Sequence, residues 1–84
     1  MYIHLGEETV VSSDSIIGIF DLEITSQSKI TREFLASEEG KKRVLNVSEE
    51  LPRSFVVCSN GEDKKTYITQ ISSQTIKRRA SRLD

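Results

Sequence analysis

Alternating apolar and polar residues at the start of the chain predict a β-hairpin. In YIHL (2–5), Ile3 and Leu5 share one face of an extended segment, and the neighbouring residues take the other face. TVVSS (9–13) follows after a Gly-Glu-Glu turn and is predicted to be the returning strand. The first part of the chain is therefore expected to form two short paired strands.

Later apolar runs predict four more strands. They are IIGIF (16–20), RVLNV (43–47), SFVVCS (54–59) and KTYITQI (65–71). The first of these is continuously apolar, which is typical of a strand buried on both faces, although Gly18 weakens it unless another group approaches the backbone closely. The Asn-Gly pair in SNGED (59–63) is a strong hairpin signal and predicts that the last two strands are joined by a tight turn.

The segment SKITREFLASEEG (28–40) has helical periodicity. Ile30 and Phe34 lie one turn apart and form an apolar stripe, with charged residues outside it. Ser28 can cap the start of this helix, and Gly40 can end it in a left-handed conformation.

A second helix is predicted over ISSQTIKRRASRL (71–83), with Ser72 or Ser73 as its cap. One face of this helix is apolar and carries Ile76, Ala80 and Leu83. The element order β-β-β-α-β-β-β-α predicts a single α+β domain over residues 1–84, with a small, mainly antiparallel sheet of about six short strands and two helices.

Composition is that of a folded domain. The 84 residues are 36% hydrophobic and 30% charged, which suits one small core. The single cysteine, Cys58, excludes a disulfide within the chain and fits a reducing compartment. No apolar run reaches transmembrane length, and residues 1–5 lack the features of a secretory signal. We therefore expect a cytoplasmic protein with no membrane partner.

No motif in the sequence is typical of an enzyme. A catalytic Cys–His pair would need His4 and Cys58 to meet, and nothing in their spacing indicates that they do. The sequence has no Cys/His cluster with metal-ligand spacing, and its glycines match no phosphate-binding or dinucleotide-binding loop. Paired glutamates are more simply explained as solvated acids than as general acid–base groups. We expect no enzyme activity, cofactor, metal or small-molecule substrate.

Positive charge is concentrated near the C-terminus. The segment QTIKRRASRLD (74–84) carries a formal charge of +3, which leaves −4 on the rest of a chain of net charge −1. Its cations could contact nucleic-acid phosphates, or they could complement the helix dipole and keep a surface face soluble. They are Lys77, Arg78, Arg79 and Arg82. Smaller basic clusters occur at Lys41-Lys42-Arg43 and Lys64-Lys65.

Self-association is a further expectation. A domain of this size with several β-branched strands exposes sheet edges and apolar surface that it must cover. Oligomerisation is a common solution for small domains.

Four segments together resemble one bacterial family. IHLG (3–6), IIGIFD (16–21), RSFVV (53–57) and ISSQTIKRRA (71–80) resemble, in order and spacing, the small extracellular matrix regulatory proteins of the RemA/RemB family, and the RemB branch is the more similar. The resemblance implies a fold similar to the LytTR DNA-binding domain. It also implies a regulator that activates biofilm matrix genes, with subunits in closed rings that hold double-stranded DNA around the outside. In the RemA branch, arginines in two loops carry the phosphate contacts.

The family arginines are matched only in part. Ser15 stands where one of them lies, just before the third strand, and Glu50 and Leu51 replace an Arg-Arg pair before RSFVV. Arg53 matches one basic position of that loop. The loss of three cations removes most of the favourable free energy that counterion release would give to DNA binding at this surface. An acidic side chain that faces a phosphate is also repulsive. The candidate DNA-binding residues are therefore Arg53, Lys64, Lys65, Lys77, Arg78, Arg79 and Arg82.

Two hypotheses follow. The first is a non-enzymatic regulator of matrix and biofilm gene expression, a ring-forming homo-oligomer in which symmetry multiplies weak phosphate contacts. The second is an oligomeric protein-interaction module that acts through another regulator without contacting DNA. Under either hypothesis, the basic face of the terminal helix could pair with the acidic surface of a neighbouring subunit instead of DNA.

Overall fold

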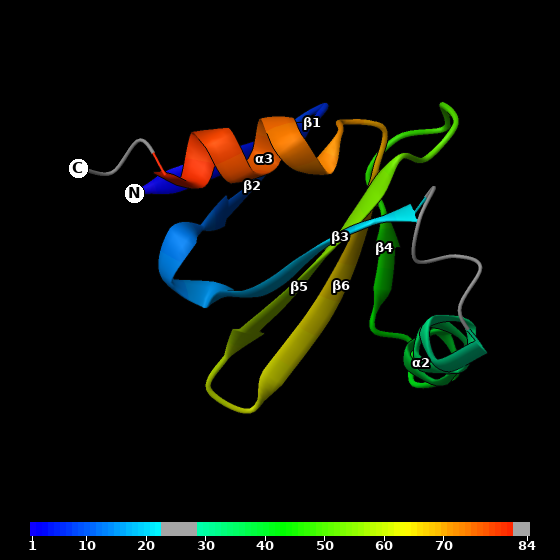
Figure 1. Cartoon of the computed structure of the whole chain (residues 1–84). Helices are drawn as coiled ribbons and strands as arrows, with labels where there is room; N and C mark the ends of the chain where they lie inside the picture. Colours follow the sequence, from blue (N-terminus) through cyan, green and yellow to red (C-terminus); the bar gives the residue numbers. More distant parts are fainter. Residues whose placement is uncertain (23–28, 82–84) are drawn as a thin grey trace.

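The described part of the chain, residues 1–22 and 29–81 of this computed structural model, contains six strands and two helices (Figure 1). The strands are β1 (Tyr2–Gly6), β2 (Thr9–Ser12), β3 (Ile16–Asp21), β4 (Val44–Asn46), β5 (Ser54–Asn60) and β6 (Asp63–Thr69). The helices are α2 (Lys29–Gly40) and α3 (Ser73–Ala80), and a 3₁₀ turn, η1 (Ser13–Ser15), joins β2 to β3. The predicted α+β class and element order are confirmed.

The strands form two sheets. β1 and β2 pair antiparallel, and the other four strands form a second sheet in the order β3-β5-β6-β4. Pairing in the second sheet is antiparallel except for β4, which runs parallel to β6. The β5–β6 turn contains only Gly61 and Glu62, because Asn60 pairs with Asp63. Gly61 has a φ of 69°, which glycine adopts without steric cost.

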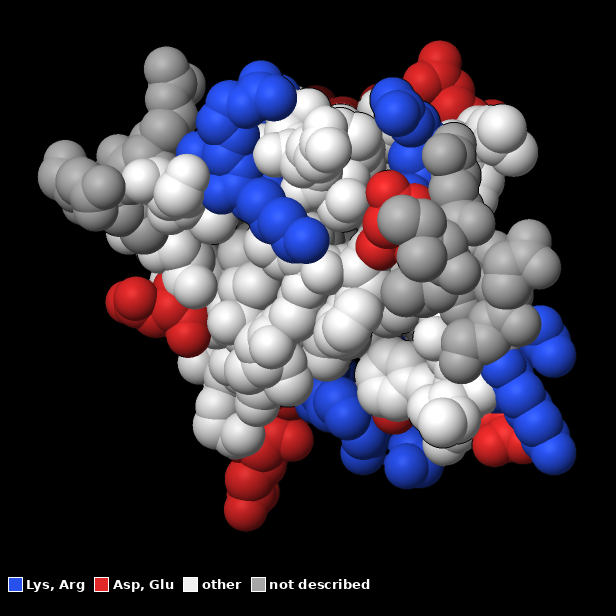
Figure 2. All heavy atoms as spheres, in the orientation of Figure 1, with Lys and Arg blue, Asp and Glu red and all other residues white. Residues whose placement is uncertain are grey.

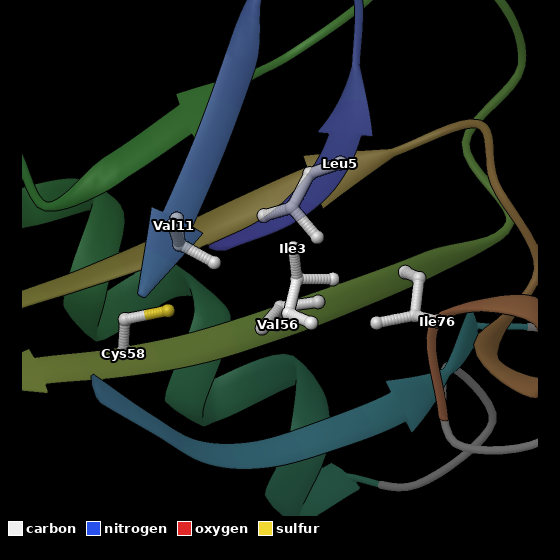
Figure 3. Close-up of a cluster of buried hydrophobic side chains, with 6 residues drawn as sticks. All are labelled: Ile3, Leu5, Val11, Val56, Cys58 and Ile76. Carbon is white, nitrogen blue, oxygen red and sulfur yellow. The ribbon is translucent and has the colours of Figure 1, made fainter. Parts of the chain in front are cut away.

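The core lies between the second sheet and a layer made by the β1–β2 hairpin and α3 (Figure 3). Its buried side chains are Ile3, Leu5, Val11, Val56, Cys58 and Ile76. Successive strand residues point to opposite faces of a sheet, so Phe55 and Val57 face away from this core. On that second face, the ring of Phe34 from α2 lies 6.4 Å from the ring of Phe55, measured between centroids. The second sheet is therefore packed between the hairpin–α3 layer and α2.

The prediction that IIGIF is buried on both faces is wrong. β3 is an edge strand, and Ile17 remains 63% exposed and Phe20 39% exposed. A continuous apolar run does not distinguish a central strand from an edge strand that lies beside an apolar groove. The close approach expected at Gly18 is made by Phe20, because any Cβ on Gly18 would overlap the Phe20 ring. That ring stacks on Phe55 with centroids 4.9 Å apart.

The predicted cap at the start of α3 is confirmed, whereas the predicted conformation at the end of α2 is wrong. Ser72 caps α3 by accepting a hydrogen bond from the Thr75 backbone N–H at 3.2 Å, as predicted. Gly40 ends α2 but is not left-handed, and Lys42 takes that conformation instead, with a φ of 61°. Predicted roles for Ser28 and Leu83 fall outside the described residues.

Candidate nucleic-acid interface

Helix α3 presents cations on the side opposite to its core contact. Ile76 is fully buried and Ala80 packs against the same core, whereas Lys77 and Arg78 are exposed. Figure 2 shows Lys and Arg side chains gathered over this helix. Lys77, Arg78 and Arg79 all occupy its last turn, where positive charge complements the helix dipole. The predicted amphipathic helix is therefore present over the described residues, and Arg82 lies beyond them.

Arg79 has a structural contact that the sequence did not reveal. Its Nη1 donates to the carbonyl oxygen of His4 at 2.7 Å, and the residue is half-buried. This bond ties α3 to β1, two elements at opposite ends of the sequence. Arg79 is thus partly engaged in holding the helix, while Lys77 and Arg78 remain available to a ligand.

Arg53 lies at the same end of the second sheet as the start of α3. Its backbone N–H donates to the Thr69 carbonyl at 2.9 Å, and its carbonyl accepts from the Leu22 N–H at 3.0 Å. The next residue, Ser54, donates from Oγ to the carbonyl of Ile71 at 2.6 Å, just before α3. The exposed Arg53 side chain therefore projects from a segment of backbone that is fixed by hydrogen bonds to Thr69, Leu22 and Ile71.

Lys64 and Lys65 lie at the other end of β6, beside the β5–β6 turn (Figure 1). Lys64 points toward α2, where its Nζ lies 3.8 Å from Oε1 of Glu38 and 5.1 Å from the centroid of the Phe34 ring. Lys65 lies on the opposite face of the strand. The predicted set is therefore not one cluster: Arg53 lies near the start of α3, the helix cations occupy its last turn, and the two lysines lie at the other end of β6.

An acidic groove occupies the surface between the β1–β2 turn and the loop from β4 to β5. Its volume is about 860 Å³, and no Lys or Arg is among its lining residues. They are Glu7, Glu8, Thr9, Asn46, Val47, Ser48, Glu49 and Glu50. Glu7 and Glu8 were interpreted from sequence as a pair of solvated acids. The fold brings them beside Glu49 and Glu50, so the loop in which the family resemblance implies arginines carries concentrated negative charge.

Ser15, the other position at which the resemblance implies an arginine, is half-buried in η1. Its hydroxyl donates to the carbonyl of Ser12 at 2.7 Å and also hydrogen-bonds the Cys58 thiol. Ser15 and Cys58 line a cavity of about 590 Å³ that Tyr67 and Lys65 also border. Burial raises the pKa of Cys58 above 9.0, and the Ser15 hydrogen bond offsets part of that shift. A thiol in this state is a poor nucleophile at neutral pH.

The raised pKa values predict a loss of stability at alkaline pH. Burial raises the Tyr67 pKa above 10.0, and the charge of Cys58 raises it further. A group with a raised folded-state pKa binds more protons when folded, so the stability contributed by Cys58 and Tyr67 is fully present below their unfolded-state pKa values and is lost as pH rises through the folded pKa. Urea titrations at alkaline pH should show a shallower decline in the free energy of unfolding for Cys58→Ala than for the wild type.

The structure separates the residues considered for catalysis. Ile3 and Leu5 of β1 point into the core that contains Cys58, so His4 between them points outward. The His4 Nε2 lies 2.7 Å from the carbonyl oxygen of Glu7, on the surface. Within the described ranges, no group of three or more His, Cys, Asp or Glu residues could hold a metal ion. No helix among those residues is long and apolar enough to cross a membrane.

Comparisons with known proteins agree over almost the whole chain. A family model described as RemA-like, extracellular matrix regulatory protein A-like, matches residues 2–80. The chain is also 40% identical, over 80 residues, to extracellular matrix regulatory protein B of Bacillus subtilis (strain 168). That alignment covers 95% of this chain and 90% of the relative. The family-model match spans both sheets, α2 and α3.

Proposed function

Because this chain belongs to the RemA-like family of extracellular matrix regulatory proteins, we propose that it regulates matrix gene expression without catalysing a reaction. The resemblance to the RemA/RemB family, and to its RemB branch, is confirmed by these matches. We further propose that Arg53 and α3 contact double-stranded DNA and that copies of the chain assemble into a ring. The regulatory name of the relative supports the first part of the proposal.

The observation that carries the DNA proposal is the exposed cationic face of α3. Lys77 and Arg78 project from a helix that Ile76 anchors in the core, so their positions are well defined. Arg53 adds a third exposed cation, in the chain just before β5 and near the start of α3. Three phosphate contacts give weak binding by one subunit, and several subunits on one DNA molecule multiply it.

Exposed apolar residues support assembly. Ile17, Ile30 and Leu51 are each more than half exposed, and the first two line one apolar groove, which is the kind of contiguous patch found at interaction sites. Small domains commonly cover such surface by oligomerisation. Light scattering of the purified protein should give the mass of a ring-sized particle, and that mass should increase when duplex DNA is added at low salt. A monomeric mass would contradict the ring.

DNA binding should depend steeply on salt and on α3. With about three phosphate contacts per subunit, raising salt from about 50 to about 200 mM should weaken each subunit's affinity roughly 40-fold. Fluorescence anisotropy with labelled duplex DNA measures this decline. Charge reversal in the double variant Lys77→Glu/Arg78→Glu should reduce binding at least about hundredfold, because it replaces two attractive phosphate contacts with repulsive ones.

The matched control reverses Lys41 and Lys42, two exposed cations in the turn after α2. It changes the net charge by the same amount as the α3 double variant. If the two double variants lose affinity equally, binding reflects overall charge and not the α3 surface. If the wild type fails to bind DNA even at low salt, the DNA proposal is wrong.

A second function is favoured by the acidic groove. Glu7, Glu8, Glu49 and Glu50 would repel phosphate but attract a basic segment of a partner regulator. Under this alternative, the protein binds no DNA at any salt concentration. The double variant Glu50→Arg/Leu51→Arg distinguishes the two proposals: it should strengthen DNA binding if the α3 surface already binds DNA, and it should abolish binding of a basic partner if the groove is the functional surface.

A further inference from the structure

Helix α2 is attached to the sheet in an unusual way. A surface helix normally buries an apolar stripe, but the only buried residue among Lys29–Gly40 is a carboxylate, Glu38, at 2% exposure. Ile30, which should belong to the apolar stripe, is 79% exposed. Phe34 and Leu35 are only half-buried. Apolar burial therefore contributes less than usual to holding this helix in place.

The Glu38 carboxylate joins α2 to two strands. Its Oε2 lies 3.6 Å from Nη1 of Arg43, which immediately precedes β4, and its Oε1 lies 3.8 Å from Nζ of Lys64 in β6. Oε1 has no hydrogen-bond partner among the described residues. Burial of a carboxylate is costly, and these long ion pairs offset that cost only in part. The electrostatic contact that helps hold α2 against the sheet is therefore a weak one, because its attraction only partly offsets the cost of burying the carboxylate.

An apolar groove of about 320 Å³ lies beside this contact, between α2 and the outer face of β3 and β5. Its apolar side chains are Ile17, Phe20, Ile30, Phe34, Phe55 and Val57. Lys64 borders the same groove and also packs its Nζ over the Phe34 ring. Lys64 therefore both pairs with Glu38 and forms part of the groove wall, so a movement of Lys64 that breaks the ion pair also changes the shape of the groove.

The connection after α2 is held to the helix end by two backbone hydrogen bonds, in which the Lys42 N–H donates to the Glu39 carbonyl and the Arg43 N–H donates to the Glu38 carbonyl, both at 2.9 Å. Gly40 ends the helix, and Lys42 adopts a positive φ before the chain enters β4. The Arg43 carbonyl accepts from the Thr66 N–H at 2.8 Å, which fixes the strand side of this connection to the sheet. Movement of α2 away from the sheet therefore has to break the backbone bond from Arg43 to Glu38, but it leaves the β4–β6 pairing intact.

We propose that α2 is a flap that opens and closes over the apolar groove, and that Glu38, shared between Arg43 and Lys64, is the latch that holds the flap closed. Opening separates Phe34 from Phe55 and exposes the outer face of β5. Local opening of this kind takes place without global unfolding, because the hairpin–α3 core lies on the other face of the sheet.

Hydrogen exchange measured by mass spectrometry tests the proposal on the full chain. Glu38→Gln keeps the side-chain shape but removes the charge, and Lys64→Met removes one cation while retaining an apolar stem against Phe34. In both variants, amides of residues 29–40 should exchange at least tenfold faster than in the wild type, with β5 and β6 unchanged. Glu39→Gln is the matched control, because Glu39 is the exposed neighbour on the same helix, and it should leave α2 exchange unchanged.

The same experiment can overturn the proposal. Equal acceleration in α2, β5 and β6 would mean that Glu38 contributes to global stability and is not a local latch. Unchanged exchange of α2 in Lys64→Met would exclude the latch even if Glu38→Gln failed to fold. Binding of a hydrophobic dye should also increase in Glu38→Gln but not in Glu39→Gln, because neither residue lines the groove and only an open flap exposes Phe55 and Val57.

Discussion

Replacement of Ile76 by alanine should lower the free energy of unfolding by about 3–4 kcal/mol. Ile76 is fully buried where α3 meets the hairpin and the second sheet, so truncation leaves a cavity that three elements would have to close together (Figure 3). A domain of this length is stabilised by roughly 4–13 kcal/mol in total, so the loss is a large fraction of it. Urea denaturation monitored by circular dichroism measures the change.

The matched control is Ile17→Ala, which removes the same atoms from a side chain that is 63% exposed. It should cost less than about 1 kcal/mol, because little apolar surface returns to water. Equal destabilisation by the two variants would contradict the placement of the core between the hairpin–α3 layer and the sheet. A large effect of Ile17→Ala that appears only at high protein concentration would instead indicate that Ile17 lies in a subunit interface.

Replacement of Thr69 by valine should cost about 2–3 kcal/mol, even though valine has nearly the same shape. The buried Thr69 hydroxyl donates to the carbonyl of Leu5 and accepts from the Ile71 N–H at 3.2 Å. Valine would leave both backbone groups unpaired in the interior, where each carries a desolvation penalty. The Leu5 bond also joins the two sheets, so its loss weakens their packing.

Thr66→Val is the natural control for this experiment. Thr66 lies three residues earlier in the same strand and is fully buried, but its hydroxyl has no hydrogen-bond partner among the described residues. Removing an unsatisfied hydroxyl should change the free energy of unfolding by less than about 0.5 kcal/mol, or increase it. Thermal unfolding of both variants would reveal the difference, and equal destabilisation would contradict the hydrogen-bond assignment of Thr69.

Much of the fold could be predicted because local patterns determined each element. Alternation placed Ile3 and Leu5 together on one face of β1, which is the buried face in the structure, and the serine cap placed the start of α3 correctly. The parallel pairing of β4 with β6 could not be predicted, because strand order depends on contacts between segments far apart in sequence. Similarly, the apolar run of β3 carried no information on its position at a sheet edge. The similarity to the LytTR domain stays a prediction.

The candidate site was predicted less completely, for physical reasons that differ between residues. The exposed cations of α3 followed from helical periodicity, which assigns faces directly. By contrast, Lys64 carried no local signal of its pairing with Glu38, because the partner lies on a helix distant in the sequence. The position of Glu7 and Glu8 in the same groove as Glu49 and Glu50 likewise depends on tertiary structure alone.

The bonds from Arg79 to His4 and from Thr69 to Leu5 have a consequence for biosynthesis. They join residues 75 and 64 positions apart, so β1 packs against α3 and β6, which are synthesised much later than β1. The apolar side chains of the nascent hairpin stay uncovered until α3 has been synthesised and released from the exit tunnel. Contacts of such long sequence separation also form slowly. Folding of this domain therefore follows the synthesis of α3, and the uncovered apolar surface of the hairpin is prone to aggregation before then.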